Sequence, residues 1–240
     1  MGLYGAGWRT QPLSAEAQAL YAAAIAEIKT PGAILVEDPF LGTDFSNLAS
    51  GEEFDLRGME SMPHDVENFL RRMGSSAKAT SLAGLAALLE VNPFSPEGPL
   101  GTHLVQPILK KSLENPALPP DLSEFLAARV AYLKTFNSVM AQHKLDVLIF
   151  PQMSAQIPGI FGEDYPATTV SEINIAGLPG VTIPAGKFAN GAPFALILVG
   201  AMWSEAELLD LAYDYEQSSA HRIVPVLEET VYAGALTEGQ

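Results

Sequence analysis

The sequence predicts an α/β fold with a mixed, largely parallel sheet flanked by helices. Three continuous apolar runs without polar alternation, typical of strands covered on both faces, support this prediction: residues 147–150, 181–183 and 194–199. Helical patterns alternate with these runs along the chain, as in other α/β proteins. Because 240 residues can bury one substantial core, we expect a single domain over residues 1–240.

The first helix is predicted to begin after Ser14, a good N-cap residue, and to extend to about Ile28. Its apolar residues recur with helical spacing, at positions 13, 17, 20, 21, 24, 25 and 28. Pro31 and Gly32 then end the helix. The apolar run at 33–36 is bounded by turn residues and is expected to form a short buried strand.

The segment 52–144 is expected to be an excursion from the domain, made mainly of helices and loops. A helix at 52–72 is interrupted by Gly58 and Pro63, and a shorter helix at 82–91 is capped by Thr80 or Ser81. The region 92–120 is expected to be mostly loop, with a helix around 108–113, because prolines occur at 93, 96, 99, 107, 116, 119 and 120.

Two later helices begin with a capping-box pattern, in which a capping residue is followed three positions later by Glu. Asp121 and Glu124 begin a helix to about residue 143, and Ser204 and Glu207 begin the last helix. The last helix is expected to turn its apolar face to the sheet, with Leu208, Leu211, Ala212 and Tyr215 on that face.

Composition excludes several classes of function. A formal net charge of −15 disfavours nucleic acid and anionic membranes as partners, because both select basic surfaces. The chain has 0 cysteines, and its 4 histidines show no metal-binding spacing, so we expect no metal and no cofactor. No run reaches the length of a membrane-spanning helix and the N-terminus has no signal-peptide pattern, so we expect a cytoplasmic protein.

A series of motifs between Asp146 and Gln217 points to one family. In order, they are Asp146-Val-Leu-Ile-Phe-Pro151, Asn174-Ile-Ala-Gly-Leu-Pro-Gly-Val-Thr-Ile-Pro-Ala-Gly186, Gly191-Ala-Pro-Phe-Ala-Leu-Ile-Leu-Val-Gly200, Ser204-Glu-Ala-Glu-Leu-Leu209 and Tyr215-Glu-Gln217. This series resembles the C-terminal half of the amidase signature family, whose members hydrolyse carboxamides through a Ser-Ser-Lys relay. The resemblance implies an amidase-like α/β fold.

The same resemblance implies a catalytic lysine and a Gly-Gly-Ser-Ser-Gly-Gly-Ser type segment. Residues 1–240 contain no such Gly/Ser segment. No catalytic residue is therefore assigned. We expect the chain to contribute scaffold and substrate wall to an amidase and to be inactive alone, with a catalytic half in trans or self-association as its partner. The alternatives are a non-catalytic protein that binds amides or peptides, and a truncated fragment without independent function.

By resemblance, the pocket for a small amide ligand would be lined by Gln152, Met153, Phe161 and Asn174. These residues follow strand ends, where open α/β sheets bind ligands. Ile157 and Ile173 would belong to the same wall, although simple packing within loops explains these two equally well.

Two positions depart from the family's pattern. The family often has Pro-Thr where this chain has Pro151-Gln152, and usually has Gly-Val-Gln-Leu where it has Ala195-Leu-Ile-Leu198. Ile197 thus replaces a polar Gln that would need a hydrogen-bond partner inside the fold. This replacement indicates either relaxed constraint in a non-catalytic chain or ordinary variation.

A rival catalytic motif is the Ser-x-x-Lys spacing of Ser75 and Lys78, in which a lysine could deprotonate a serine. Matches to so short a pattern are frequent by chance, and the accessory motifs of penicillin-recognising enzymes are absent. We therefore predict that this segment is not catalytic.

Overall fold

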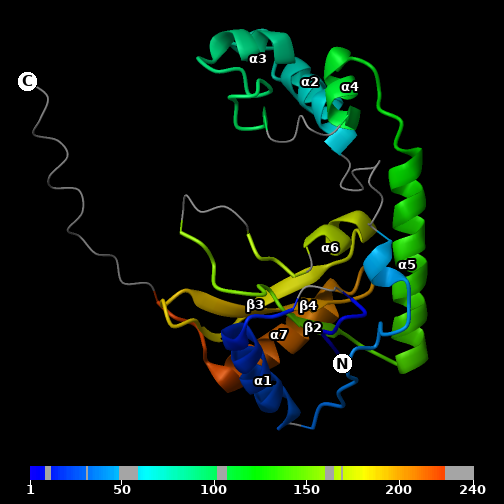
Figure 1. The fold of residues 1–240 in the computed structure, drawn as a ribbon, viewed down its shortest axis with the longest axis vertical. Coiled ribbons are helices and arrows are strands. Elements are labelled where there is room, and N and C mark those ends of the chain that lie inside the picture. Colours follow the sequence, from blue (N-terminus) through cyan, green and yellow to red (C-terminus); the bar gives the residue numbers. More distant parts are fainter. Residues whose placement is uncertain are drawn as a thin grey trace, which may run out of the picture.

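The centre of the fold is a sheet of four strands in the described residues, ordered β1-β2-β4-β3 (Figure 1). The computed structural model describes residues 1–8, 12–30, 32–48, 59–101, 107–159, 165–168 and 170–224. The strands are β1 (Gly2–Leu3), β2 (Leu148–Pro151), β3 (Gly180–Lys187) and β4 (Pro193–Val199). The last three contain most or all of each predicted apolar run, and β4 lies inside the sheet, as its fully apolar sequence requires.

The sheet is mixed and flanked by helices, as predicted, but parallel pairing does not dominate it in the described residues. β1 pairs with β2 in parallel, whereas β4 pairs antiparallel with both β2 and β3. Only residues 188–192 separate β3 from β4, and the Phe188 N–H donates to the Ala192 carbonyl at 2.9 Å. A parallel crossover needs about a dozen residues or more, so this link can make only a hairpin.

One face of the sheet packs against α5 (Ser123–His143), α6 (Val170–Ala176) and the 3₁₀ helix η1 (Phe45–Asn47). The sheet contributes Leu148, Phe150, Ile197 and Val199 to this core. We call this side the α5 face. Its centre is a group of aromatic rings that includes Trp8, whose ring centroid lies 4.7 Å from that of Phe150.

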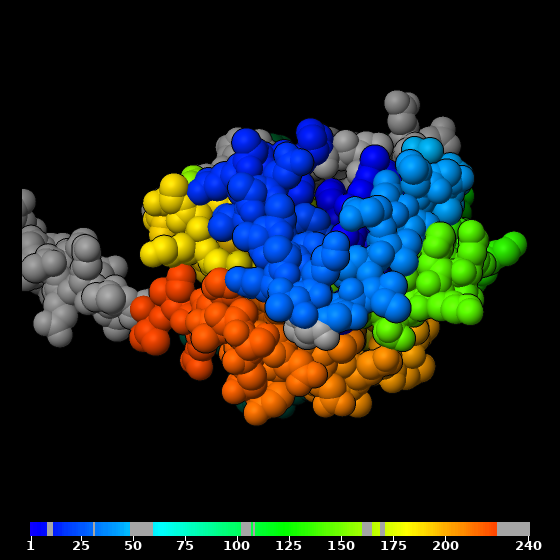
Figure 2. All heavy atoms as spheres, turned by 90° about the horizontal axis from the view of Figure 1, so that it is seen from below, coloured from blue at the N-terminus to red at the C-terminus, as the bar shows by residue number. Residues whose placement is uncertain are grey.

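The opposite face packs against α1 (Ala15–Lys29) and α7 (Glu205–Ser219), and we call it the α1/α7 face. Figure 2 shows these two helices, in blue and orange, side by side over that face. The predicted apolar face of the last helix is confirmed, because Leu208, Ala212 and Tyr215 are buried and Leu211 packs against the same core.

Helix starts only partly follow the predicted capping. Ser14 accepts a hydrogen bond from the Ala17 N–H at 3.2 Å, which confirms it as the N-cap of α1. The two predicted capping boxes are wrong. Asp121 instead accepts from the Ser123 N–H in a turn before α5, and the Ser204 hydroxyl donates to the Ala201 carbonyl at 2.8 Å. Both side chains therefore satisfy neighbouring backbone groups rather than the third N–H of their helix.

The predicted strand at 33–36 is also wrong. Only Val36 makes a bridge, to Gly2, and Ile34 is 82% exposed. The strand at the edge of the sheet next to β2 is instead the two-residue strand β1.

Three further helices form a separate group at one end of the molecule (Figure 1). They are α2 (Met62–Arg72), α3 (Leu82–Leu88) and α4 (Pro107–Glu114), with the 3₁₀ helix η2 (Met59–Ser61) preceding α2. Buried Glu67 of α2 accepts from the Leu82 N–H at 2.7 Å, which places a carboxylate at the positive N-terminus of α3. Of the predicted 52–72 helix, residues 59–72 form η2 and α2, and residues 52–58 lie outside the described residues.

Within the described ranges, no helix combines the length and the apolar content needed to cross a membrane.

Candidate functional site

The predicted wall begins where β2 ends, and hydrogen bonds hold this turn in place. The Ser154 N–H donates to the Pro166 carbonyl at 2.7 Å, and the Thr168 N–H donates to the Gln152 carbonyl at 3.2 Å. Buried Thr168 also donates its hydroxyl to the Pro151 carbonyl. The backbone around Gln152 is therefore fixed by the segment that leads into α6.

The side chain of Gln152 lies on the open part of the sheet. Its Oε1 accepts a hydrogen bond from the Thr182 hydroxyl at 2.7 Å, while its backbone N–H donates to the Ala195 carbonyl at 2.8 Å. Gln152 thus links the end of β2 to β3, across the intervening strand β4. Thr182 is exposed and Gln152 is half-buried, so the pair is accessible to a ligand.

Sequence reasoning did not single out Thr182. The alternation of side chains along the strand could have identified it, because successive side chains point to opposite faces of the sheet. Ile183 and Ala185 of β3 are buried on the α1/α7 face, so Gly180, Thr182 and Pro184 occupy the other side, where they are exposed or half-buried.

The other predicted wall residues differ in burial and contacts. Met153 is buried and bridges to Ala167. Asn174 is exposed on α6, and no hydrogen bond links it to Gln152 or Met153 in the described part of the chain. Ile173 packs against the core on the α5 face, and Ile157 is half-buried. Phe161 lies outside the described residues.

The rival Ser-x-x-Lys motif lies in a turn after α2, remote from the sheet in Figure 1. Ser75, Ser76 and Lys78 are not buried, and no hydrogen bond joins Lys78 to either serine in the described residues. A serine is activated by a base within hydrogen-bond reach, and this geometry provides none.

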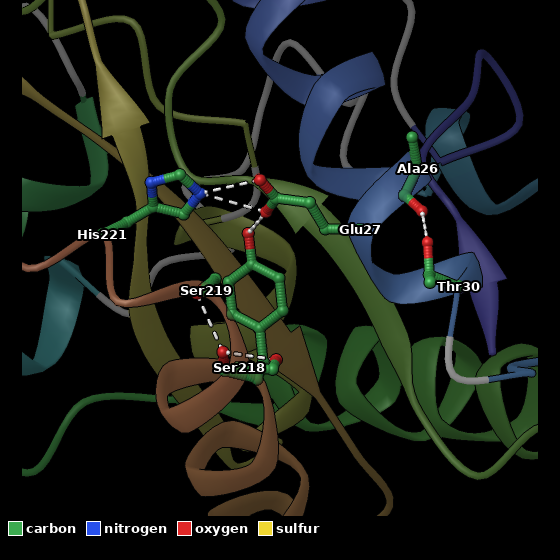
Figure 3. A network of polar contacts seen from close by, with 7 residues as sticks. Ala26, Glu27, Thr30, Ser218, Ser219 and His221 are labelled. Carbon is green, nitrogen blue, oxygen red and sulfur yellow. Dashed lines mark hydrogen bonds and ion pairs between the residues drawn. The ribbon is translucent and has the colours of Figure 1, made fainter.

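A second polar network occupies the opposite side of the sheet. Glu27 of α1 accepts from the Tyr215 hydroxyl at 2.8 Å and lies 3.0 Å from Nε2 of His221 (Figure 3). Glu27 and Tyr215 also line a cavity of about 350 Å³ with apolar residues such as Ile149 and Leu198. The network joins α1 to the end of α7, and it does not include any predicted wall residue.

This network makes the stability of the fold sensitive to alkaline pH. Burial, together with the hydrogen bond to Glu27, raises the pKa of Tyr215. An unfolded tyrosine has a pKa of about 10. Above that pH the unfolded chain releases a proton that folded Tyr215 retains, so its contribution is complete below about pH 10 and is lost as the pH rises.

We therefore expect Tyr215→Phe to show a smaller loss of melting temperature than the unmodified protein between about pH 9 and pH 11. Thermal unfolding followed by circular dichroism measures this difference. Tyr213→Phe, on the exposed side of the same helix, is the matched control and should keep the original pH dependence. Equal pH dependence in all three proteins would show that Tyr215 keeps an ordinary pKa.

Comparisons with known proteins find similarity to amidases and to an amidotransferase subunit. No family model matches the chain. Over 99 residues it is 37% identical to a glutamyl-tRNA(Gln) amidotransferase subunit of Roseobacter denitrificans, an alignment covering 38% of this chain and 20% of that relative. Its fold matches the peptide amidase of Stenotrophomonas maltophilia with a TM-score of 0.62 at 24% identity, covering 94% of this chain and 44% of the amidase.

A bacterial aryl acylamidase of the amidase signature family matches with a TM-score of 0.54 at 18% identity, over 91% of this chain and 43% of that one. The chain is similar in fold to part of these amidases. It spans less than half the length of these two solved structures. Its strands β2, β3 and β4 carry the motifs that predicted the family, and Gln152 and Thr182 lie between them.

Proposed function

We propose that these 240 residues provide the scaffold and one wall of an amide-hydrolysing site. In this proposal the lysine, the two serines and the oxyanion donors belong to polypeptide outside these residues. The observation that carries it is the Gln152–Thr182 pair on the open part of a sheet of amidase type, in a sequence without the Gly/Ser segment.

The role of such a wall is to position the amide. Holding the reacting carbonyl at a fixed distance from a nucleophile lowers the entropic barrier of attack, and stabilising the oxyanion lowers it further. The wall supplies the first effect, and the Gly/Ser segment supplies the second together with the nucleophile. Gln152, Met153, Phe161 and Asn174 remain the proposed wall residues, and we add Thr182 to them.

A free sheet edge supports association with further polypeptide. β3 is eight residues long and pairs only with β4 among the described strands. An unpaired strand edge can pair with a strand of another segment. We therefore propose that the outer edge of β3 receives the catalytic half, or a second copy of this chain when that half is absent.

Coexpression tests the proposed function. This chain, produced with the N-terminal half of a close relative that contains the lysine and the Gly/Ser segment, should copurify as a complex that hydrolyses carboxamides. Each half alone should be inactive, because a nucleophile without its base is weak. Changing the nucleophilic serine of the added half to Ala should abolish the activity. Hydrolysis by this chain alone would contradict the proposal.

A further inference from the structure

A cavity of about 350 Å³ lies on the α1/α7 face, on the side of the sheet opposite to Thr182. Its floor is formed by Ile149 of β2, Ile183 of β3 and Leu198 of β4, whose side chains are buried. The C-terminal parts of α1 and α7 form its sides. This volume falls in the range of small-molecule pockets, which are lined mainly by apolar groups with a few polar groups at fixed positions.

The polar part of the cavity is acidic. Glu27 of α1 and Asp214 of α7 both line it and are exposed to solvent, which places them at its opening rather than on its floor. Glu27 is held by Tyr215, whose hydroxyl donates to it at 2.8 Å, and by His221 (Figure 3). Asp214 has no hydrogen-bond or ion-pair partner among the described residues. One carboxylate is thus fixed in place, and the other is available to a ligand.

The backbone adds negative potential at the same place. α1 ends at Lys29 and α7 at Ser219, and the last turn of a helix carries a partial negative charge. The nitrogen groups of His221 and Met1 already have partners, because His221 lies against Glu27 and the Met1 ammonium donates to the Ile34 carbonyl at 2.9 Å. The opening of the cavity therefore favours a positively charged ligand.

We propose that this cavity binds an organic ammonium ion with an apolar body, such as an arylalkylamine. The apolar body lies against Ile149, Ile183 and Leu198, and the ammonium group reaches Asp214 and Glu27. Glu27 can serve Tyr215 and the ligand together, because a carboxylate accepts about four hydrogen bonds. A neutral ligand of the same shape gains only burial, and an anion is repelled by both carboxylates. The charge of the ligand is therefore what the site selects.

Chemical-shift titration of the ¹⁵N-labelled chain tests this site with phenethylammonium. The backbone signals of Leu198, Leu211 and Ser218 should shift saturably, with a dissociation constant on the order of 1 mM. Phenethyl alcohol is neutral and should bind at least about threefold more weakly, and the anion hydrocinnamate should not bind. Equal affinity for the ammonium ion and the alcohol, or shifts that do not saturate, would rule out the site.

Asp214→Asn should raise the dissociation constant for phenethylammonium about threefold, the factor expected for a solvent-exposed ion pair, and leave that for phenethyl alcohol unchanged. Glu205→Gln is the matched control, because it removes the same charge from the first turn of α7 and should have no effect. Equal losses in the two variants would show that net charge alone attracts the ligand, and would overturn the proposal.

Ser218→Trp tests the location of the site. Ser218 lines the cavity and is exposed, so a large side chain there covers the opening without entering the core, and binding of both compounds should be lost. Gln217→Trp, at the next exposed position, is the control and should bind as the unmodified protein does. Binding that persists in Ser218→Trp would contradict the proposed location. Asp214→Asn decides the question if circular dichroism shows that Ser218→Trp does not fold.

This inference does not rest on the proposed function, because the cavity and the Gln152–Thr182 pair lie on opposite sides of the sheet. Absence of amidase activity on coexpression would leave the ammonium site in place, and absence of phenethylammonium binding would leave the proposed function in place.

Discussion

Leu198→Asp is expected to lower the free energy of unfolding by at least about 4 kcal/mol, because the new carboxylate would be buried without a partner. Leu198 is 2% exposed. It lies in the interior strand β4, opposite Ile149 of β2 and Val181 of β3, and its side chain packs in the core beneath α1 and α7. Such a loss is a large share of the total stability of an ordinary domain, about 5–15 kcal/mol.

Urea unfolding monitored by circular dichroism measures the effect. Leu209→Asp is the matched control, because Leu209 is 58% exposed on α7 and its replacement should change stability by no more than about 0.5 kcal/mol. An unchanged free energy of unfolding in Leu198→Asp would mean that β4 is exposed and that the strand order is wrong.

Phe150 packs on the opposite face of the sheet. Phe150→Ala is expected to lower the free energy of unfolding by about 3–5 kcal/mol, through lost burial and the cavity left behind. Phe150 is 0% exposed. Its ring meets that of Tyr4 edge to face at 5.5 Å between centroids, and that of Trp8 at 4.7 Å. These contacts join β2 to the N-terminal segment, so their loss weakens the connection between distant parts of the chain.

The control is Phe69→Ala, since Phe69 is 54% exposed on α2 and should contribute little to folding. Guanidinium unfolding of both variants, followed by tryptophan fluorescence, provides the comparison. Similar losses in the two variants would contradict the assignment of Phe150 to the core on the α5 face.

The sequence predicted the position of those helices and strands whose apolar pattern is long. The apolar run at 194–199 became β4, and the stripe on the last helix became the buried face of α7. Strand direction was harder to predict, because pairing between β2 and β4 depends on distant segments. The antiparallel pairing of β3 and β4 could have been inferred, since residues 188–192 are too few for a crossover.

The candidate site was predictable only in part. Gln152 stood out because it follows a strand end, but its partner Thr182 is 30 positions away in sequence and is brought near by the order of the strands. The edge strand β1 was also invisible to a pattern search, because its two residues are too short for any periodicity. In both cases the missing information is tertiary pairing, which local spacing does not encode.

We propose that the nucleophile of the amidase site lies outside these 240 residues. Labelling of the coexpressed complex with a fluorophosphonate, followed by mass spectrometry of each polypeptide, tests it most directly. We expect label on the Gly/Ser segment of the added half and none on this chain. Label on Ser75 or Ser76 would contradict it, and would assign the chemistry to the Ser-x-x-Lys turn after α2.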